Sequence, residues 1–187
     1  MTSQDKIFTF KQILYLLLIS VFLGIFKVEF FISFIDAELT ESTRIISYIT
    51  LGISSIFFYF VIIIAILATY FTIDMLKLGS HFNINNFYKA INYFVWSLMI
   101  NELLKFLITI FTFESMSNIS TEIEFNETIS NNKLWIDLIS YSDFFFILVG
   151  GLIYASMLKN NDKNVNYFEA FFSTFILYLS FIIFRIF

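Results

Sequence analysis

Long apolar runs alternate with short polar stretches along this chain. A helix crosses the hydrocarbon core of a membrane with about 20 residues, and five runs reach or exceed that length. The second run has no charged residue in 29 positions. The pattern predicts an all-α fold: a polytopic membrane helical bundle that forms one transmembrane domain over residues 1–187. The five predicted spans are residues 7–30, 45–73, 87–113, 134–158 and 168–187.

Composition agrees with this pattern and narrows the chemistry. Of the 187 residues, 59% are hydrophobic, whereas soluble domains are about half apolar. Cysteine is absent and His81 is the only histidine, so disulfides, thiolate catalysis and multi-histidine metal sites are excluded. We expect His81 to be an ordinary solvated loop residue, and we predict no cofactor and no metal.

The charges predict an orientation in the plasma membrane. Lysine and arginine in short loops mark the cytoplasmic side, and with five spans most lysines fall on one side. The two loops on the other side, residues 31–44 and 114–133, are mostly acidic. This favours an N-terminus inside and a C-terminus outside. The apolar character continues past Lys27 and Glu29 to Ile35 with no small-residue cleavage site, so we expect a retained first span rather than a cleaved signal peptide. The lysines concerned are Lys6, Lys11, Lys77, Lys89, Lys159 and Lys163.

Polar side chains interrupt the third span. Asn101, Glu102 and Lys105 fall on one side of a helix at about 100° per residue. An ionised side chain near the bilayer centre costs a few kcal/mol or more unless it is paired or wetted. This face is therefore expected to look inward, toward the other helices.

A partner for this face is predicted on the fourth span. Lys105 lies about five residues past the midpoint of its span, and Asp143 about three before the midpoint of the next, so antiparallel helices place them at similar depth. We predict that Lys105 pairs with Asp143, with Glu102 as competitor or third member. The cluster either fixes helix register or lines a polar pocket or proton path. We favour register, because a relay usually needs several dense polar faces.

The fourth span also carries a patch of small residues. Gly150 and Gly151 are followed by Ala155. Without large side chains, the backbone of another helix can approach closely at such a patch. We therefore predict a helix–helix contact there.

Recognised enzyme signatures are missing from the sequence. It has no HExxH, no GxSxG and no P-loop, and these are patterns that position a zinc ion, a nucleophile or a phosphate. It also lacks the basic surface that nucleic-acid binding requires. We therefore predict that the protein is not an enzyme and binds no nucleic acid.

From about residue 87 onward the chain resembles the Yip (Ypt-interacting protein) family of five-span membrane proteins. The resemblance lies in FYKAINYFVWSLMINELLKFL at 87–107, SDFFFILVGGLIYASM at 142–157 and NYFEAFFSTFILYL at 166–179. The usual proline of the third span is missing here. Eukaryotic members also carry a long cytosolic N-terminal region that binds Rab-type GTPases; this sequence shows no such region, so GTPase binding is not expected.

The resemblance implies an interaction protein, because small bacterial members are regarded as accessory proteins, some beside exporters. We expect a small accessory or scaffold protein in the lipid bilayer, contacting another membrane protein or a second copy of itself. The complex that we expect it to join is an exporter or a peptide-toxin defence system. The alternative is a transporter or channel subunit that uses Glu102 and Lys105.

Overall fold

A computed structural model describes residues 3–34, 40–76, 83–113 and 122–186 of the chain. Within these ranges every regular element is an α-helix, which confirms the predicted all-α class for this part of the protein. Lys77 and His81 lie outside the described residues, as does the side chain of Lys6.

The described residues form six helices, and four of these, α1, α2, α3 and α5, are long and apolar enough to cross a membrane. Most of the predicted spans continue by a few residues into the flanking polar sequence, because interfacial residues can complete the last helical turns. The six helices are α1 (Ser3–Ile32), α2 (Thr40–Leu76), α3 (Ile84–Phe113), α4 (Glu122–Asn131), α5 (Lys133–Asn161) and α6 (Tyr167–Ile186).

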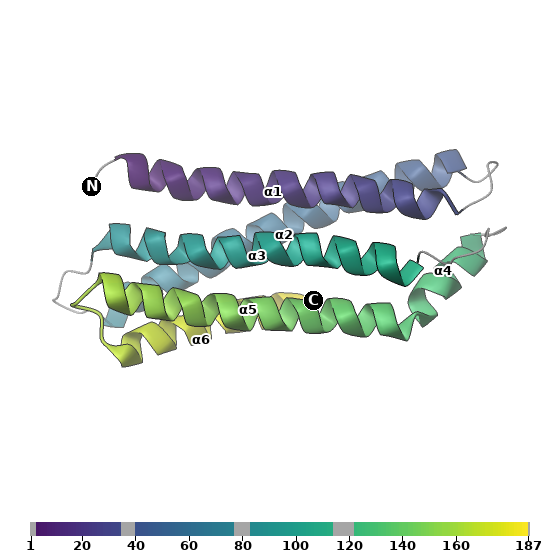
Figure 1. The fold of residues 1–187 in the computed structure, drawn as a ribbon. Coiled ribbons are helices and arrows are strands. Elements are labelled where there is room, and N and C mark those ends of the chain that lie inside the picture. The colour runs from purple at the N-terminus through teal and green to yellow at the C-terminus, as the bar shows by residue number, and fades with distance from the viewer. Residues whose placement is uncertain (1–2, 35–39, 77–82, 114–121, 187) are drawn as a thin grey trace.

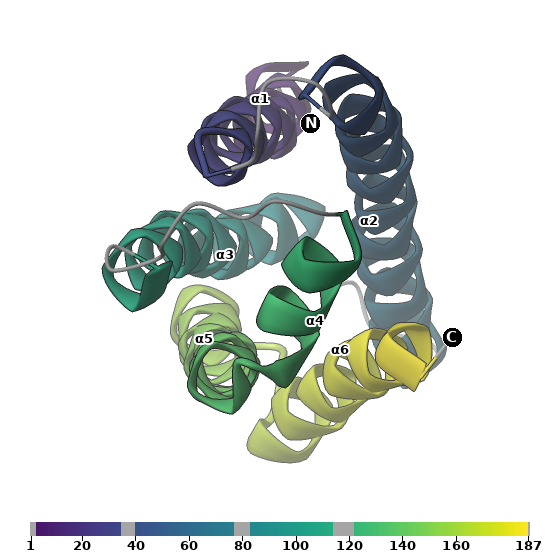
Figure 2. The same ribbon diagram turned by 90° about the vertical axis from the view of Figure 1, so that its right-hand side faces the viewer.

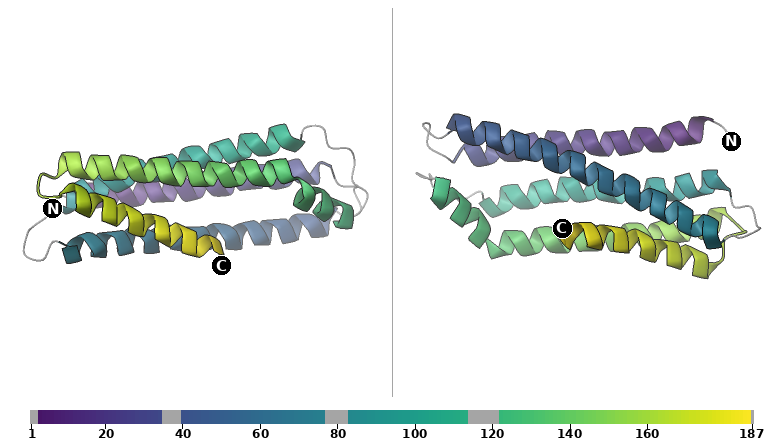
Figure 3. Two further views of the ribbon diagram at one scale, coloured as in Figure 1. Left: turned by 90° about the horizontal axis from the view of Figure 1, so that it is seen from below. Right: turned by 180° about the vertical axis from the view of Figure 1, so that it is seen from behind.

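The five long helices reverse direction one after another (Figure 1). One end of the bundle, which we call the N-terminal end, contains the starts of α1, α3 and α6 and the ends of α2 and α5. Helix α4 lies at the opposite end, which we call the α4 end. Viewed end-on, the helices form a ring in which α1 contacts α3, α3 contacts α5, α5 contacts α6, α6 contacts α2, and α2 returns to α1 (Figure 2). The last helix, α6, ends partway along the bundle (Figure 3).

Helix α4 differs from the sequence prediction, which has only a polar loop at 114–133. The described part of that segment is helical from Glu122 to Asn131, and α5 begins almost at once. Asn132 separates the two helices and accepts a hydrogen bond from the backbone N of Trp135 at 3.0 Å, which is the usual action of an N-cap. A helix of ten mostly polar residues is too short and too polar to stand out among the long apolar runs that predicted the other helices.

The core occupies the half of the bundle nearer the N-terminal end. All five long helices contribute, with Leu16, Ile62, Phe94, Tyr154 and Leu177 each almost wholly buried. In lipid the surroundings are as apolar as the core, so close packing rather than removal from water holds these side chains together.

The paired glycines of α5 face two neighbours. A Cβ added at Gly150 would lie 2.0 Å from Ser97 Oγ of α3, and one at Gly151 would lie 2.4 Å from Tyr178 of α6. The Tyr178 hydroxyl donates to the carbonyl oxygen of Leu148 at 2.6 Å. The predicted small-residue patch therefore lies at a close helix–helix contact. It allows α5 to approach both α3 and α6 closely.

Hydrogen bonds join two distant polar segments at the N-terminal end. The backbone N of Asn83 donates to Asp162 Oδ2 at 2.7 Å, and Asn86 Nδ2 donates to the carbonyl oxygen of Asn161 at 2.7 Å. Asp162 is only 3% exposed. These bonds hold the start of α3 against the connection between α5 and α6, although the segments are 79 and 75 residues apart in the chain.

Candidate functional site

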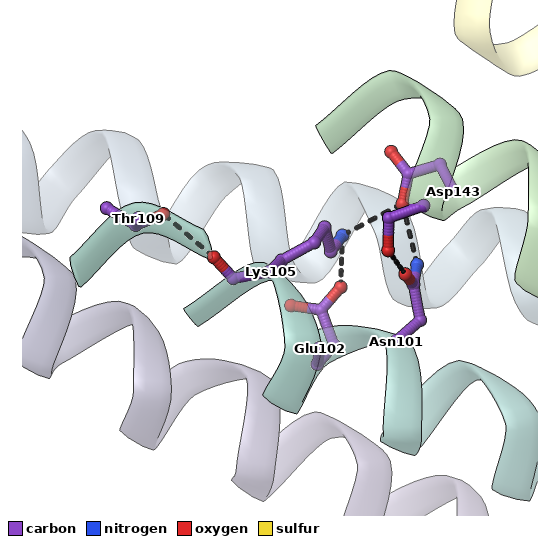
Figure 4. Close-up of polar contacts among 6 residues, drawn as sticks. Asn101, Glu102, Lys105, Thr109 and Asp143 are labelled. Atoms are coloured by element: carbon purple, nitrogen blue, oxygen red, sulfur yellow. Dashed lines mark hydrogen bonds and ion pairs between the residues drawn. The ribbon is translucent and has the colours of Figure 1, made fainter. Parts of the chain in front are cut away.

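The polar face of α3 lies between α1 and α5, as the cost of exposing it to lipid requires. Asn101 is 3% exposed and Glu102 is 8% exposed. Lys105 and Asp143 are more accessible, and their side chains are mostly covered. The structure brings all four residues of the predicted intramembrane polar cluster together (Figure 4).

One carboxylate oxygen connects the two helices. Asp143 Oδ1 accepts a hydrogen bond from Asn101 Nδ2 at 2.7 Å and lies 3.2 Å from Lys105 Nζ. Lys105 Nζ also forms an ion pair with Glu102, one turn earlier on α3. The predicted Lys105–Asp143 pair is present, and Glu102 is its third member rather than a competitor.

Ser142 is a further member that sequence reasoning missed. Its hydroxyl donates to Asn101 Oδ1, so consecutive residues of α5 occupy both ends of the Asn101 amide. Its position next to Asp143 could have indicated that it belongs to the cluster. However, a serine in a membrane helix often bonds to the backbone of its own helix instead.

Lys27 of α1 is the second residue that the sequence analysis did not assign to the cluster. The half-buried Lys27 interacts electrostatically with Glu102, Lys105 and Asp143. The predicted first span ends at residue 30, which makes Lys27 an interfacial residue. In the structure α1 continues to Ile32 and packs along α3, with the Phe26 and Phe106 rings 6.4 Å apart.

Polar contacts continue from Lys105 toward the α4 end. Thr109 Oγ1 donates to the carbonyl oxygen of Lys105 at 2.8 Å, and Trp135 Nε1 donates to Thr109 Oγ1 at 3.1 Å. The Trp135 ring packs edge-on against Phe113 at 5.6 Å and Phe31 at 6.5 Å. Helices α1, α3 and α5 thus stay in register beyond the charged residues.

The arrangement of the cluster has two consequences: its charges balance, and it connects neighbouring helices. Its two amines, Lys27 and Lys105, and its two carboxylates, Glu102 and Asp143, have charges that sum to zero, so burial leaves no net charge in the bundle. Its geometry joins α3 to α5 through charge-assisted hydrogen bonds, which are stronger than neutral ones, and Lys27 of α1 adds an electrostatic interaction. Within the described residues, no three histidine, cysteine, aspartate or glutamate side chains gather as a metal site would require.

No protein-family model, no curated protein and no solved structure matches the chain.

Proposed function

We propose that the chain crosses the plasma membrane five times, with the N-terminal end of the bundle in the cytoplasm. Helix α6 has 20 residues, so it is about 30 Å long, close to the thickness of the hydrocarbon core. It packs against α2 and α5 in the same ring as the four candidate spans. Lys11, Lys89, Lys159 and Lys163 belong to helix ends and connections at the N-terminal end, which supports the cytoplasmic assignment.

The absence of cysteine makes this topology directly testable. Single-cysteine variants at the exposed residues Glu124 and Lys163 report opposite ends of the bundle. A membrane-impermeant maleimide applied to intact cells is expected to label Glu124→Cys and to spare Lys163→Cys until the cells are lysed. An epitope tag placed after Phe187 is expected to bind antibody from outside. The reverse labelling would overturn the orientation, and a protected tag would overturn the fifth crossing.

We further propose that the protein acts by contact, as an accessory or scaffold subunit of a membrane complex. The observation that carries this is the surface at the N-terminal end where residues 83–89 meet residues 159–166, which we call the platform. The Asn83–Asp162 and Asn86–Asn161 hydrogen bonds fix its two halves. A polar surface held in place before binding loses less conformational entropy when a partner docks.

The charge of the platform indicates the chemistry of its partner. Lys89 and Lys163 are exposed there, and the ammonium of Lys159 lies 5.4 Å from the centre of the Tyr167 ring. Two acids bonded to the platform are buried: Asp162 accepts from the backbone N of Asn83 and Asn164, and Glu169 accepts from the backbone N of Asn166. The platform thus suits an acidic cytoplasmic segment of another membrane protein. We propose an exporter or a peptide-toxin defence system as the complex that contains this partner. The resemblance to the Yip family is part of the same proposal.

Recovery of the tagged protein from native membranes tests the contact. A specific membrane protein is expected to copurify with the wild type, and Lys163→Glu is expected to weaken recovery several-fold because it places a negative charge against an acidic partner. Lys133→Glu is the matched control, since Lys133 is an exposed lysine at the start of α5, far from the platform. Recovery of only the lone chain or a self-oligomer would count against the accessory role.

A transporter or channel subunit is the second candidate, and the convergence of ionisable groups from three helices favours it. Glu102 of α3 and Asp143 of α5 both contact Lys105, and Lys27 of α1 interacts electrostatically with them. If the cluster carries protons or ions, flux through proteoliposomes should fall with Glu102→Gln. Flux that is indifferent to this change removes the candidate.

A further inference from the structure

A cavity of about 320 Å³ lies between α1, α3 and α5 near the N-terminal end. Gln12 lines it from α1, Met157 and Asn161 from α5, and four residues from α3. The α3 residues, Lys89, Asn92, Tyr93 and Trp96, recur at helical spacing and share one face of the helix. Tyr93 and Trp96 on this face are about half exposed, so the cavity opens on the outside of the ring, where the lipid lies.

Two amide oxygens of side chains that line this cavity have no hydrogen-bond partner among the residues that the structure describes. Gln12 is 5% exposed and Asn92 is 6% exposed, yet neither Gln12 Oε1 nor Asn92 Oδ1 has a partner. An unsatisfied acceptor is costly in a membrane, where no bulk water replaces the missing bond. The terminal torsions of Asn and Gln are soft, so a small rotation can present either oxygen to a donor lying in the cavity.

The other lining groups define the rest of the ligand. Lys89 provides a cation at the helix end, and the described lining residues include no acid. Trp96 and Tyr93 lie deeper along α3, where amphipathic rings pack against the first acyl carbons of a lipid. The set therefore combines a phosphate partner, two hydrogen-bond acceptors and an apolar wall, which are the kinds of group that a phospholipid headgroup and its first acyl carbons contact.

We propose that this cavity binds the headgroup of a hydroxyl-bearing anionic phospholipid of the phosphatidylglycerol class. The phosphate pairs with Lys89, and the glycerol hydroxyls donate to the Gln12 and Asn92 amide oxygens. The complex is then neutral. A phosphatidylethanolamine would instead leave the excess positive charge of an ammonium with no acid beside it. The proposal rests on the proposed insertion of the bundle in a membrane but not on a protein partner, and Lys89 belongs to both the cavity and the platform.

The two tryptophans allow a direct test, since Trp96 lines the cavity and Trp135 lies on α5 toward the α4 end. In the Trp135→Phe protein, Trp96 is the reporter. In phosphatidylcholine vesicles, brominated phosphatidylglycerol is expected to quench Trp96 with about fivefold higher apparent affinity than brominated phosphatidylcholine, the gain from roughly one net hydrogen bond or ion pair. In the Trp96→Phe protein, Trp135 is expected to show no such preference.

Variants connect the preference to the cavity. Gln12→Leu and Asn92→Leu remove the acceptors, and Lys89→Met removes an exposed cation without touching the core; each is expected to reduce the preference severalfold. Lys133→Met at the α4 end is expected to leave it unchanged. Lys89→Met still tests the proposal if the buried variants fail to fold.

Three outcomes would overturn the proposal. Equal quenching of Trp96 by the two brominated lipids would show no headgroup selectivity. Equally strong quenching by brominated phosphatidylethanolamine would contradict the hydroxyl assignment. Relief of quenching by excess inorganic phosphate would show a site for a free anion rather than for a lipid.

Discussion

Replacement of Lys105 with methionine is expected to lower the free energy of unfolding by about 3–5 kcal/mol, the usual effect of removing one partner from a buried ion pair. Methionine keeps the length and apolar stem of lysine, so the loss is mainly electrostatic. Glu102 and Asp143 both contact the Lys105 ammonium and would be left close together. Lys27 is the remaining cation nearby. Unfolding in detergent, followed by circular dichroism against denaturant, measures the change.

Two further proteins make the Lys105 result specific. Lys133→Met removes an exposed lysine from the start of α5 and is expected to change stability by less than about 0.5 kcal/mol. In the triple variant Lys105→Met, Glu102→Gln, Asp143→Asn, the carboxylates lose their charge together with the ammonium, and most of the stability is expected to return. Wild-type stability for Lys105→Met alone would show that the cluster does not hold α3 to α5.

Replacement of Gly150 with valine is expected to destabilise the bundle by about 1–3 kcal/mol or more, the range for overpacking a tight contact. Even a single Cβ would lie 2.0 Å from Ser97 Oγ and 3.0 Å from the Phe94 ring. Phe94 is fully buried and Ser97 bonds to the carbonyl oxygen of Phe94 at 2.7 Å, so neither neighbour can move away freely. Helix α5 must then separate from α3. Thermal unfolding in the same detergent measures the loss.

Gly52 is the matched control for this change. It also lies inside a long helix, α2, but a Cβ there meets nothing within 4 Å. Gly52→Val changes helix propensity by the same amount, so the difference between the two variants isolates the contact with α3. Equal melting temperatures for Gly150→Val and Gly52→Val would contradict the close approach.

The sequence alone determined the features that depend on local chemistry. Apolar run length sets which segments can span lipid, and four of the five predicted spans are candidate membrane helices in the structure. The cost of burying a charge in lipid is also local, so the inward direction of Asn101, Glu102 and Lys105 followed from their spacing. Depth arithmetic then paired Lys105 with Asp143, because antiparallel helices of known rise leave few residues at equal depth.

Only the tertiary structure decided which helices are neighbours and which way each one is turned. Residue depth says nothing about rotation around the helix axis, so it could not show that Lys27 of α1 and Ser142 of α5 join the cluster. Nor could it show that Gly150 and Gly151 face two different helices, or that Asn83 bonds to Asp162 across 79 residues. These contacts depend on the order of helices around the ring, and that order results from packing between side chains far apart in the chain.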